Sequence, residues 1–140
     1  MRIDFYILAS CDDRLRLNFA CRLTEKAYRL GHDVFICTES NTQQKVVDDL
    51  LWTFRPGSFI PHAVLDISNN KQLPVVVGQN IDTQRSYNIL LNLATQFDNG
   101  PHQFERIIEL VDQNETIRTS ARQRYRRYKE QGHDLTTHQI

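Results

Sequence analysis

The chain has 140 residues, 40% hydrophobic and 24% charged, with equal numbers of basic and acidic side chains. This length suits one domain spanning residues 1–140 and is enough to bury a sizeable core. No apolar run approaches the roughly 18–20 residues that cross a bilayer, so the composition excludes a predicted membrane span. A net charge of zero also argues against a protein that coats nucleic acid along its length.

The first half of the chain alternates between strand and helix patterns. In order, these segments are residues 2–8 (strand), 12–31 (helix), 33–39 (strand) and 40–54 (helix). Gly31 is a typical residue just after a helix, and Ser40 or Thr42 is a suitable N-cap for the second helix.

The second half continues the alternation with shorter apolar runs. Its segments are residues 74–78 (buried-type strand), 87–94 (a further apolar segment), 102–111, 114–132 (helix) and 133–140. The segment 102–111 fits either a helix or a strand, and its β-branched residues favour a strand. We expect residues 133–140 to be an ordered or semi-ordered tail. The whole pattern predicts an α/β layered fold with a mostly parallel central sheet.

Motifs for nucleotide, metal or covalent chemistry are missing. No GxGxxG follows the first strand, and GxxxxGK[ST] does not occur. The five histidines lack metal-binding spacing, so we expect no cofactor or metal. The three cysteines form no CxxC, which argues against a disulfide framework and favours a reducing cytoplasm. Cys11 follows the first strand and is better explained as a small residue there than as a nucleophile.

An unusual group of aromatic residues follows the second predicted helix. On a helical wheel, the apolar residues between Val46 and Phe54 fall on one arc about 140° wide, and Trp52 lies about 170° from its centre. Phe59 and His62 follow within a few residues, in or after a turn that contains Pro and Gly. Together they are candidates for an apolar pocket with a polar rim, and the alternative is that they anchor the loop to the core.

The last predicted helix carries a cationic stripe. Arg118, Arg122, Arg126 and Lys129 fall within an arc of about 80°, with Tyr125 at its edge. A separate stripe that would face the core contains Ile117, Ala121 and Tyr128, with Arg124 close by. Like charges four residues apart repel, and no acidic residues are interleaved, so a merely solvated face does not explain the stripe well.

This basic excess is local, because residues 118–140 carry a net +4 and residues 1–117 a net −4. It therefore predicts an anionic partner at the last helix. Arginine binds carboxylates and phosphates equally well, so both an acidic peptide and a nucleic acid fit. An adjacent apolar pocket would favour a peptide that offers a hydrophobic anchor and a terminal carboxylate.

Seven segments occur in order and cover nearly the whole chain: "IDFYIL", "KAYRLGHDVFI", "LLWTFRPGSFIPH", "LPVVV", "ILLNLA", "FERIIELV" and "ARQRYRRYKEQGHDL". Together they resemble the chi subunit family of bacterial DNA polymerase III. The resemblance implies a Rossmann-like fold that binds no nucleotide and has no enzymatic activity. It also implies two partners: the acidic, Phe-ending C-terminal tail of single-stranded DNA-binding protein (SSB), and the psi subunit of the clamp loader.

The resemblance also implies which residues bind the SSB tail. These positions are Arg122, Tyr125 and Arg126 in the last helix, Arg118 one turn earlier and Phe59 in the loop, with Trp52 and His62 as nearby matches. Lysine can replace Arg118 and Arg126 in relatives, which keeps the cation. The psi-binding surface does not carry over residue by residue.

Two other functions compete with the adaptor function. One is direct binding of single-stranded nucleic acid, with arginines on phosphates and Tyr125, Trp52 and Phe59 stacking on bases. The other is a hydrolase or transferase on an α/β scaffold, for which the sequence contains no motif.

Overall fold

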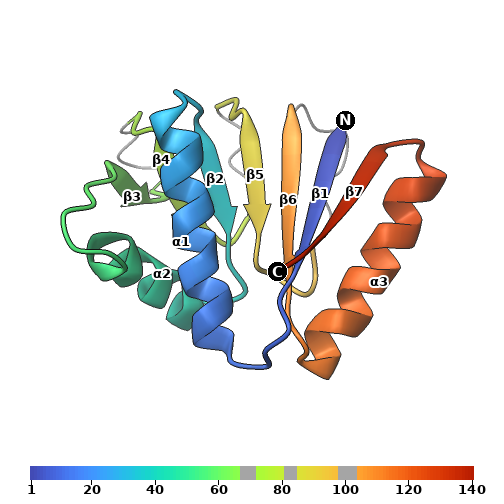
Figure 1. Ribbon diagram of the computed structural model, residues 1–140. Helices are drawn as coiled ribbons and strands as arrows, with labels where there is room; N and C mark the ends of the chain where they lie inside the picture. The colour runs from blue at the N-terminus through green and yellow to red at the C-terminus, as the bar shows by residue number, and fades with distance from the viewer. Residues whose placement is uncertain (67–71, 81–84, 98–103) are drawn as a thin grey trace.

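A single seven-stranded sheet organises the residues that the computed structural model describes, which are 1–66, 72–80, 85–97 and 104–140. Along the chain the elements are β1 (Arg2–Ile7), α1 (Asp13–Arg29), β2 (Val34–Cys37), α2 (Asn41–Thr53), β3 (His62–Val64), β4 (Val75–Gly78), β5 (Ile89–Asn92), β6 (Arg106–Val111), α3 (Glu115–Glu130) and β7 (Asp134–Gln139). The strand order is β3-β4-β2-β5-β6-β1-β7, so β3 and β7 form opposite edges (Figure 1).

Every pair of neighbouring strands in this sheet is parallel, which confirms the predicted α/β fold with a parallel sheet. The ambiguous segment 102–111 forms β6, although its first two residues lie outside the described ranges. Two strands were not predicted. The segment around His62, which was expected to lie in or after a turn, contains β3, and the expected tail is the six-residue strand β7.

Each of the three helices in the described ranges begins at a side-chain cap that the sequence supplies. Asp12 accepts from the backbone N–H of Arg14 at the start of α1, and Ser40 accepts from Gln43 at the start of α2. Asn114 does the same for Ile117 at the start of α3. These oxygens satisfy backbone donors that have no partner within the helix, which stabilises each helix start.

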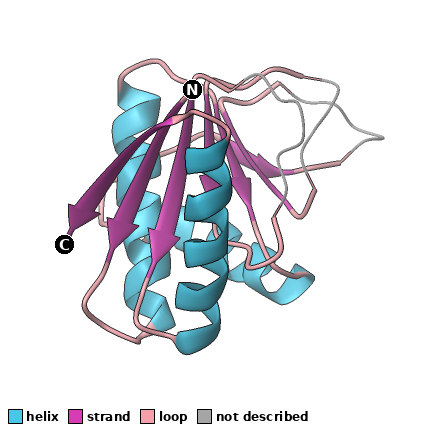
Figure 2. Cartoon of the chain, turned by 90° about the vertical axis from the view of Figure 1, so that its right-hand side faces the viewer, coloured by secondary structure: helices cyan, strands magenta, loops and turns pink. Residues whose placement is uncertain are grey.

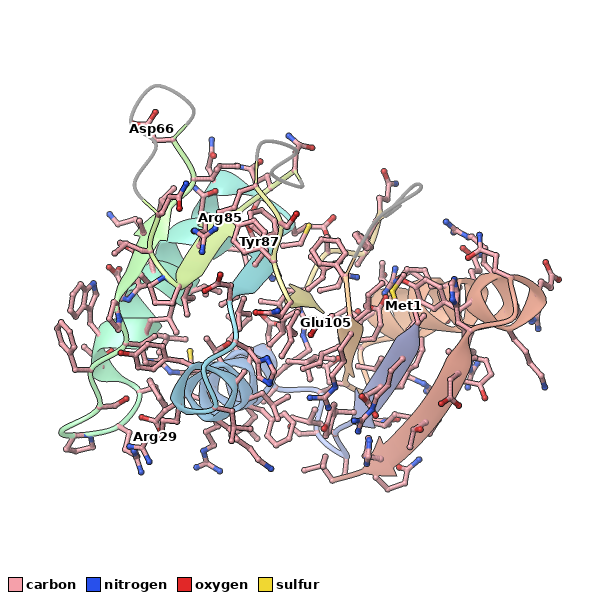
Figure 3. The ribbon with its side chains drawn as sticks, turned by 90° about the horizontal axis from the view of Figure 1, so that it is seen from above. Met1, Arg29, Asp66, Arg85, Tyr87 and Glu105 are labelled. Atoms are coloured by element: carbon pink, nitrogen blue, oxygen red, sulfur yellow. The ribbon has the colours of Figure 1, made fainter. Side chains whose placement is uncertain are left out.

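The helices cover both faces of the sheet. Figure 3 shows α1 and α2 on one side of the strands and α3 on the other. One buried apolar cluster joins α1 and α2 to the sheet, and a second contains Phe5, Tyr87, Phe97 and the buried face of α3. None of the described helices is both long and apolar enough to cross a membrane.

A buried carboxylate connects α3 to the sheet. Glu109 of β6 has no exposed surface, and its two oxygens accept hydrogen bonds from Arg124 Nε (2.9 Å) and Nη2 (3.1 Å). Tyr128 Oη and Asn92 Nδ2 donate to the same carboxylate, each at 2.9 Å. Burial, followed by the Glu109 charge, raises the pKa of Tyr128, so its hydroxyl stays protonated and remains a donor.

Polar contacts hold β7 against β1, because this strand contributes few large apolar residues. His138 Nε2 lies 2.9 Å from Oδ1 of the buried Asp4, and its ring stacks on Tyr6 at 4.4 Å between centroids. Arg106 and Arg2 contact the other Asp4 oxygen at 2.6 and 3.1 Å. Burial alone would raise the pKa of Asp4, but hydrogen bonds from His138 and Arg106 and the arginine charges lower it.

The Glu109 network yields a stability prediction. Arg124→Met leaves the Glu109 charge buried without its cation, so we expect the free energy of unfolding to fall by about 3–5 kcal/mol. Urea denaturation measures this change. Arg127→Met, at an exposed position on the same helix, is the control and should change it by no more than about 0.5 kcal/mol. Equal denaturation midpoints for the two variants would show that the network does not stabilise the fold.

The Asp4 contacts predict a dependence of stability on pH. An unfolded Asp titrates near 3.9, and the folded-state pKa of Asp4 is lower. The stabilisation is therefore present above about pH 4 and is lost as the pH falls toward the folded-state pKa. We expect Asp4→Asn to be less stable at pH 7 and to lose less stability on acidification than the wild type, as measured by thermal unfolding. The exposed Asp49→Asn should follow the wild-type curve, and an Asp4→Asn curve of unchanged slope would contradict the assignment.

Candidate functional site

Helix α3 has one face in the core and one face toward solvent. Ala121, Arg124 and Tyr128 are buried, which confirms the predicted core-facing stripe and the place of Arg124 beside it. Arg122, Arg126 and Lys129 are exposed, and Arg118 and Tyr125 are half-buried. The structure therefore presents the predicted cationic stripe on the outer side of the helix.

A groove of about 270 Å³ lies between α3 and strands β1, β6 and β7. Its floor is apolar, formed by Phe5, Ile7, Val111 and Ala121, and Tyr125 stands edge-on to Phe5 at 5.3 Å between ring centroids. The remaining lining residues are polar or charged: Gln113, Arg118, Arg122 and Thr137. The groove thus combines an apolar floor with two guanidinium groups from the first turns of α3.

The arginines of the stripe are available to an external anion. Among the described residues, ion pairs use other arginines, such as Arg55, Arg106 and Arg124. Arg118, Arg122 and Arg126 have no carboxylate partner within the described ranges. A carboxylate bound there would receive charge-assisted hydrogen bonds, which are about twice as strong as neutral ones.

Trp52 and Phe59 form a second cluster, the aromatic patch, away from the groove. Trp52 is 51% exposed and Phe59 68% exposed, and their ring centroids lie 5.8 Å apart. Trp52 faces away from the core, as the helical wheel predicts. His62 is buried beneath it, 4.6 Å from the Trp52 ring, with Nδ1 2.7 Å from the Ile60 carbonyl oxygen and Nε2 3.2 Å from Asp48 Oδ1.

The expectation that these aromatic residues and the cationic stripe line one pocket is wrong. The aromatic patch lies on α2 and beside β3, at one edge of the sheet, whereas the groove lies at the β7 edge. The two also belong to opposite faces, because α2 and α3 cover different sides of the sheet (Figure 3). Five strands separate β3 from β7, so Phe59, Trp52 and His62 cannot touch a ligand that fills the groove.

Sequence reasoning missed the groove residues that come from the sheet. Phe5, Ile7 and Val111 were assigned only to strands, and Thr137 lay in the expected tail. The two β-branched residues Thr136 and Thr137 were the available signal for β7. The pairing of β7 with β1 joins residues more than 130 positions apart, so no local pattern predicted that Thr137 would lie beside Arg122.

Features of catalytic or metal sites are sparse in the described ranges. No group of three or more His, Cys, Asp or Glu residues there could hold a metal ion. Cys11 is exposed, while burial raises the pKa values of Cys21 and Cys37 to about 12. These two thiols therefore stay protonated and behave as small core residues.

Comparison with known proteins gives one consistent family. The family described as "DNA polymerase III chi subunit, HolC" matches residues 1–136. DNA polymerase III subunit chi of Pseudomonas aeruginosa is 36% identical over 139 residues, which cover 99% of this chain and 96% of that protein. The Haemophilus influenzae subunit is 29% identical over 140 residues, which cover 97% of this chain and 95% of that protein. The Escherichia coli subunit is 28% identical over 119 residues, which cover 84% of this chain and 80% of that protein.

A solved structure resembles the chain in fold alone. The crystal structure of T4 UvsW superposes with a TM-score of 0.67 at 8% identity, covering 99% of this chain and 41% of that chain. At this identity the likeness carries no information about activity.

Proposed function

The chain belongs to the family of DNA polymerase III chi subunits, and we propose that it is a non-catalytic adaptor between the clamp-loader complex and SSB. In this proposal the acidic, Phe-ending C-terminal tail of SSB binds in the groove beside α3. The psi subunit attaches the protein to the clamp loader, and the complex works in the cytoplasm. Membership of the family itself supports an accessory role in replication.

The observation that carries the proposal is the chemistry of the groove. Its apolar floor suits one aromatic side chain, and Arg118 and Arg122 stand where they can bind the carboxylate of the same terminal residue. Arg126 and Lys129 continue the positive charge along α3 and suit the preceding acidic residues. A volume of about 270 Å³ is smaller than most drug-sized sites, which fits a single anchoring residue.

The aromatic patch is our candidate surface for psi. Large, clustered and exposed aromatic residues mark sites where proteins associate, and Trp and Tyr commonly dominate binding energy there. The hydrogen bond between His62 Nδ1 and the Ile60 carbonyl, at 2.7 Å, fixes the buried His62 ring, whose centroid lies 4.6 Å from that of Trp52. Because the patch and the groove lie at opposite sheet edges, one molecule can hold both partners at the same time.

Direct binding of single-stranded DNA has less support. Such binders place aromatic rings among cations along one groove. Here Trp52 and Phe59 lie at the far edge from the arginines. Among the described aromatic residues, Tyr125 and the buried Phe5 line the groove. The Tyr125 ring also packs against Phe5. A bound peptide can fill the groove while Tyr125 keeps this contact with Phe5.

The first functional prediction concerns Arg122. We expect Arg122→Ala to weaken binding of an acidic peptide ending in Phe by about 1.5–3 kcal/mol, because it removes a charged hydrogen-bond donor from the groove. Isothermal titration measures the affinity, and thermal unfolding checks the fold. Arg127→Ala is the matched control, since Arg127 is exposed on the same helix and does not line the groove.

Two further binding measurements distinguish a peptide ligand from a nucleic-acid ligand. A peptide without its terminal Phe should not bind, and a bare oligonucleotide should bind weakly at near-physiological salt, because phosphate contacts weaken steeply as salt rises. Tighter binding of the oligonucleotide, or full affinity of Arg122→Ala for the peptide, would contradict the SSB-tail proposal.

The second functional prediction separates the two surfaces. We expect Phe59→Ala to leave affinity for the peptide unchanged and to weaken psi binding by about 2 kcal/mol or more, the size of an interface hot spot. Its thermal stability should change little, because the side chain is mostly exposed. Leu30→Ala is a matched control, since Leu30 at the end of α1 is equally exposed at 68% and does not contact the Trp52 ring. If Phe59→Ala loses the peptide instead, the aromatic patch takes part in tail binding after all.

A further inference from the structure

Strand β7 offers an open edge directly beside the groove. It is the last strand of the sheet, and among the described residues only β1 pairs with it. Figure 2, which faces this side of the molecule, shows β7 as the outermost strand, ending at the C-terminus. An unpaired strand edge is a template on which another extended chain can form backbone hydrogen bonds.

The register shows which backbone groups are available. Asp134 N donates to the Met1 carbonyl and Ile140 N to the Ile7 carbonyl, so even-numbered residues of β7 point their N–H and C=O toward β1. In a parallel ladder the alternate residues point the other way. The amide and carbonyl groups of Leu135, Thr137 and Gln139 therefore face outward.

The opposite edge of the sheet is less suited to strand addition. β3 has only three residues, and Pro61, which lacks an N–H, comes directly before it. Short strands and prolines protect sheet edges from unwanted pairing. β7 has six residues and no proline or lysine, so its edge lacks these protections.

Thr137 belongs both to the open edge of β7 and to the groove. Thr137 presents its side chain to the groove and its backbone to the outer edge. If the last side chain of a bound peptide enters the groove, the residues before it would lie along the outer edge of β7. Tail binding and strand pairing can therefore use one continuous surface.

The cationic stripe sets the direction of such a chain. Helix α3 runs antiparallel to β7 (Figures 1 and 2), so Arg126 and Lys129 lie toward the start of β7 and Arg118 and Arg122 toward its end. The seven helical steps from Arg122 to Lys129 rise about 10 Å, which corresponds to about three residues of an extended strand. A peptide with its C-terminus at Arg122 and acids just upstream would match these charges if it ran parallel to β7.

We propose that an acidic C-terminal peptide binds here as an eighth, parallel strand on β7, with its terminal side chain in the groove. Its backbone pairs with Leu135, Thr137 and Gln139. The residue two positions before its last one faces α3 near Arg126, because side chains alternate between the two faces of a strand. The inference rests on the proposed function, because it describes how the same groove holds the same class of peptide.

Hydrogen exchange tests this pairing in the full chain. The probe is an acidic peptide ending in Phe, at saturating concentration, with exchange resolved at single amides by NMR. We expect exchange at Leu135, Thr137 and Gln139 to slow at least about tenfold on binding. Thr136 and His138, whose amides already face β1, are internal controls and should change far less.

Substitutions at Thr137 test the same pairing by affinity. Thr137→Pro removes one outward N–H, and a proline is tolerated where an edge amide faces solvent. Thr137→Val changes the same side chain and keeps the amide. We therefore expect Thr137→Pro to bind the peptide about two- to tenfold more weakly than Thr137→Val, the effect of one backbone hydrogen bond. Peptides N-methylated at alternate positions should show a matching alternation of weak and normal binding.

The outcomes distinguish this inference from the proposed function. Arg122-dependent binding without protection of the three amides would overturn the strand pairing and leave the adaptor function standing. Protection with the expected alternation would support both. If the peptide does not bind the wild-type protein at all, both the proposed function and the eighth strand are wrong.

Discussion

The buried ion pair between Glu109 and Arg124 determines how α3 is rotated against the sheet. A carboxylate with no exposed surface requires a cation and further donors, and Arg124 and Tyr128 on α3 supply them. Once Arg124 points inward, helical geometry directs Arg122 and Arg126 outward, since each lies about 200° around the helix axis from it. The outward cationic face of the helix is thus a consequence of an interaction in the core.

Polar side chains occupy the carboxyl ends of β5, β6 and β1, the end of the sheet where α/β proteins usually bind their ligands. Arg16 directs Nη1 toward the Leu93 and Leu110 carbonyl oxygens, and the Gln113 side chain donates to the Leu8 carbonyl. The Gln113 backbone N–H donates to the Ser10 carbonyl in the same region. The candidate site lies instead between α3 and the last strand, where an apolar face of the sheet remains open.

The two edges of the sheet have different chemistry, which agrees with the proposed adaptor function. Beside β3 the exposed residues are aromatic, and beside β7 they are cations around an apolar floor. Surfaces this far apart cannot compete for one ligand, so each can be optimised for its own partner. The sheet between them is the rigid element that holds the two surfaces at a constant separation.

Periodicity in the sequence alone predicted the parallel α/β fold, the core-facing stripe of α3 with Arg124 beside it, and the outward position of Trp52, because these properties depend on residues within one segment. The structure decided which segments are neighbours. It showed that the C-terminal segment is a strand, since its pairing with β1 depends on backbone bonds and on the buried Asp4 rather than on an apolar pattern. It also separated Phe59 from Arg122. From the sequence, residues could be grouped only by their chemistry. Which of them are neighbours in space depends on the strand order, and no local pattern encodes that order.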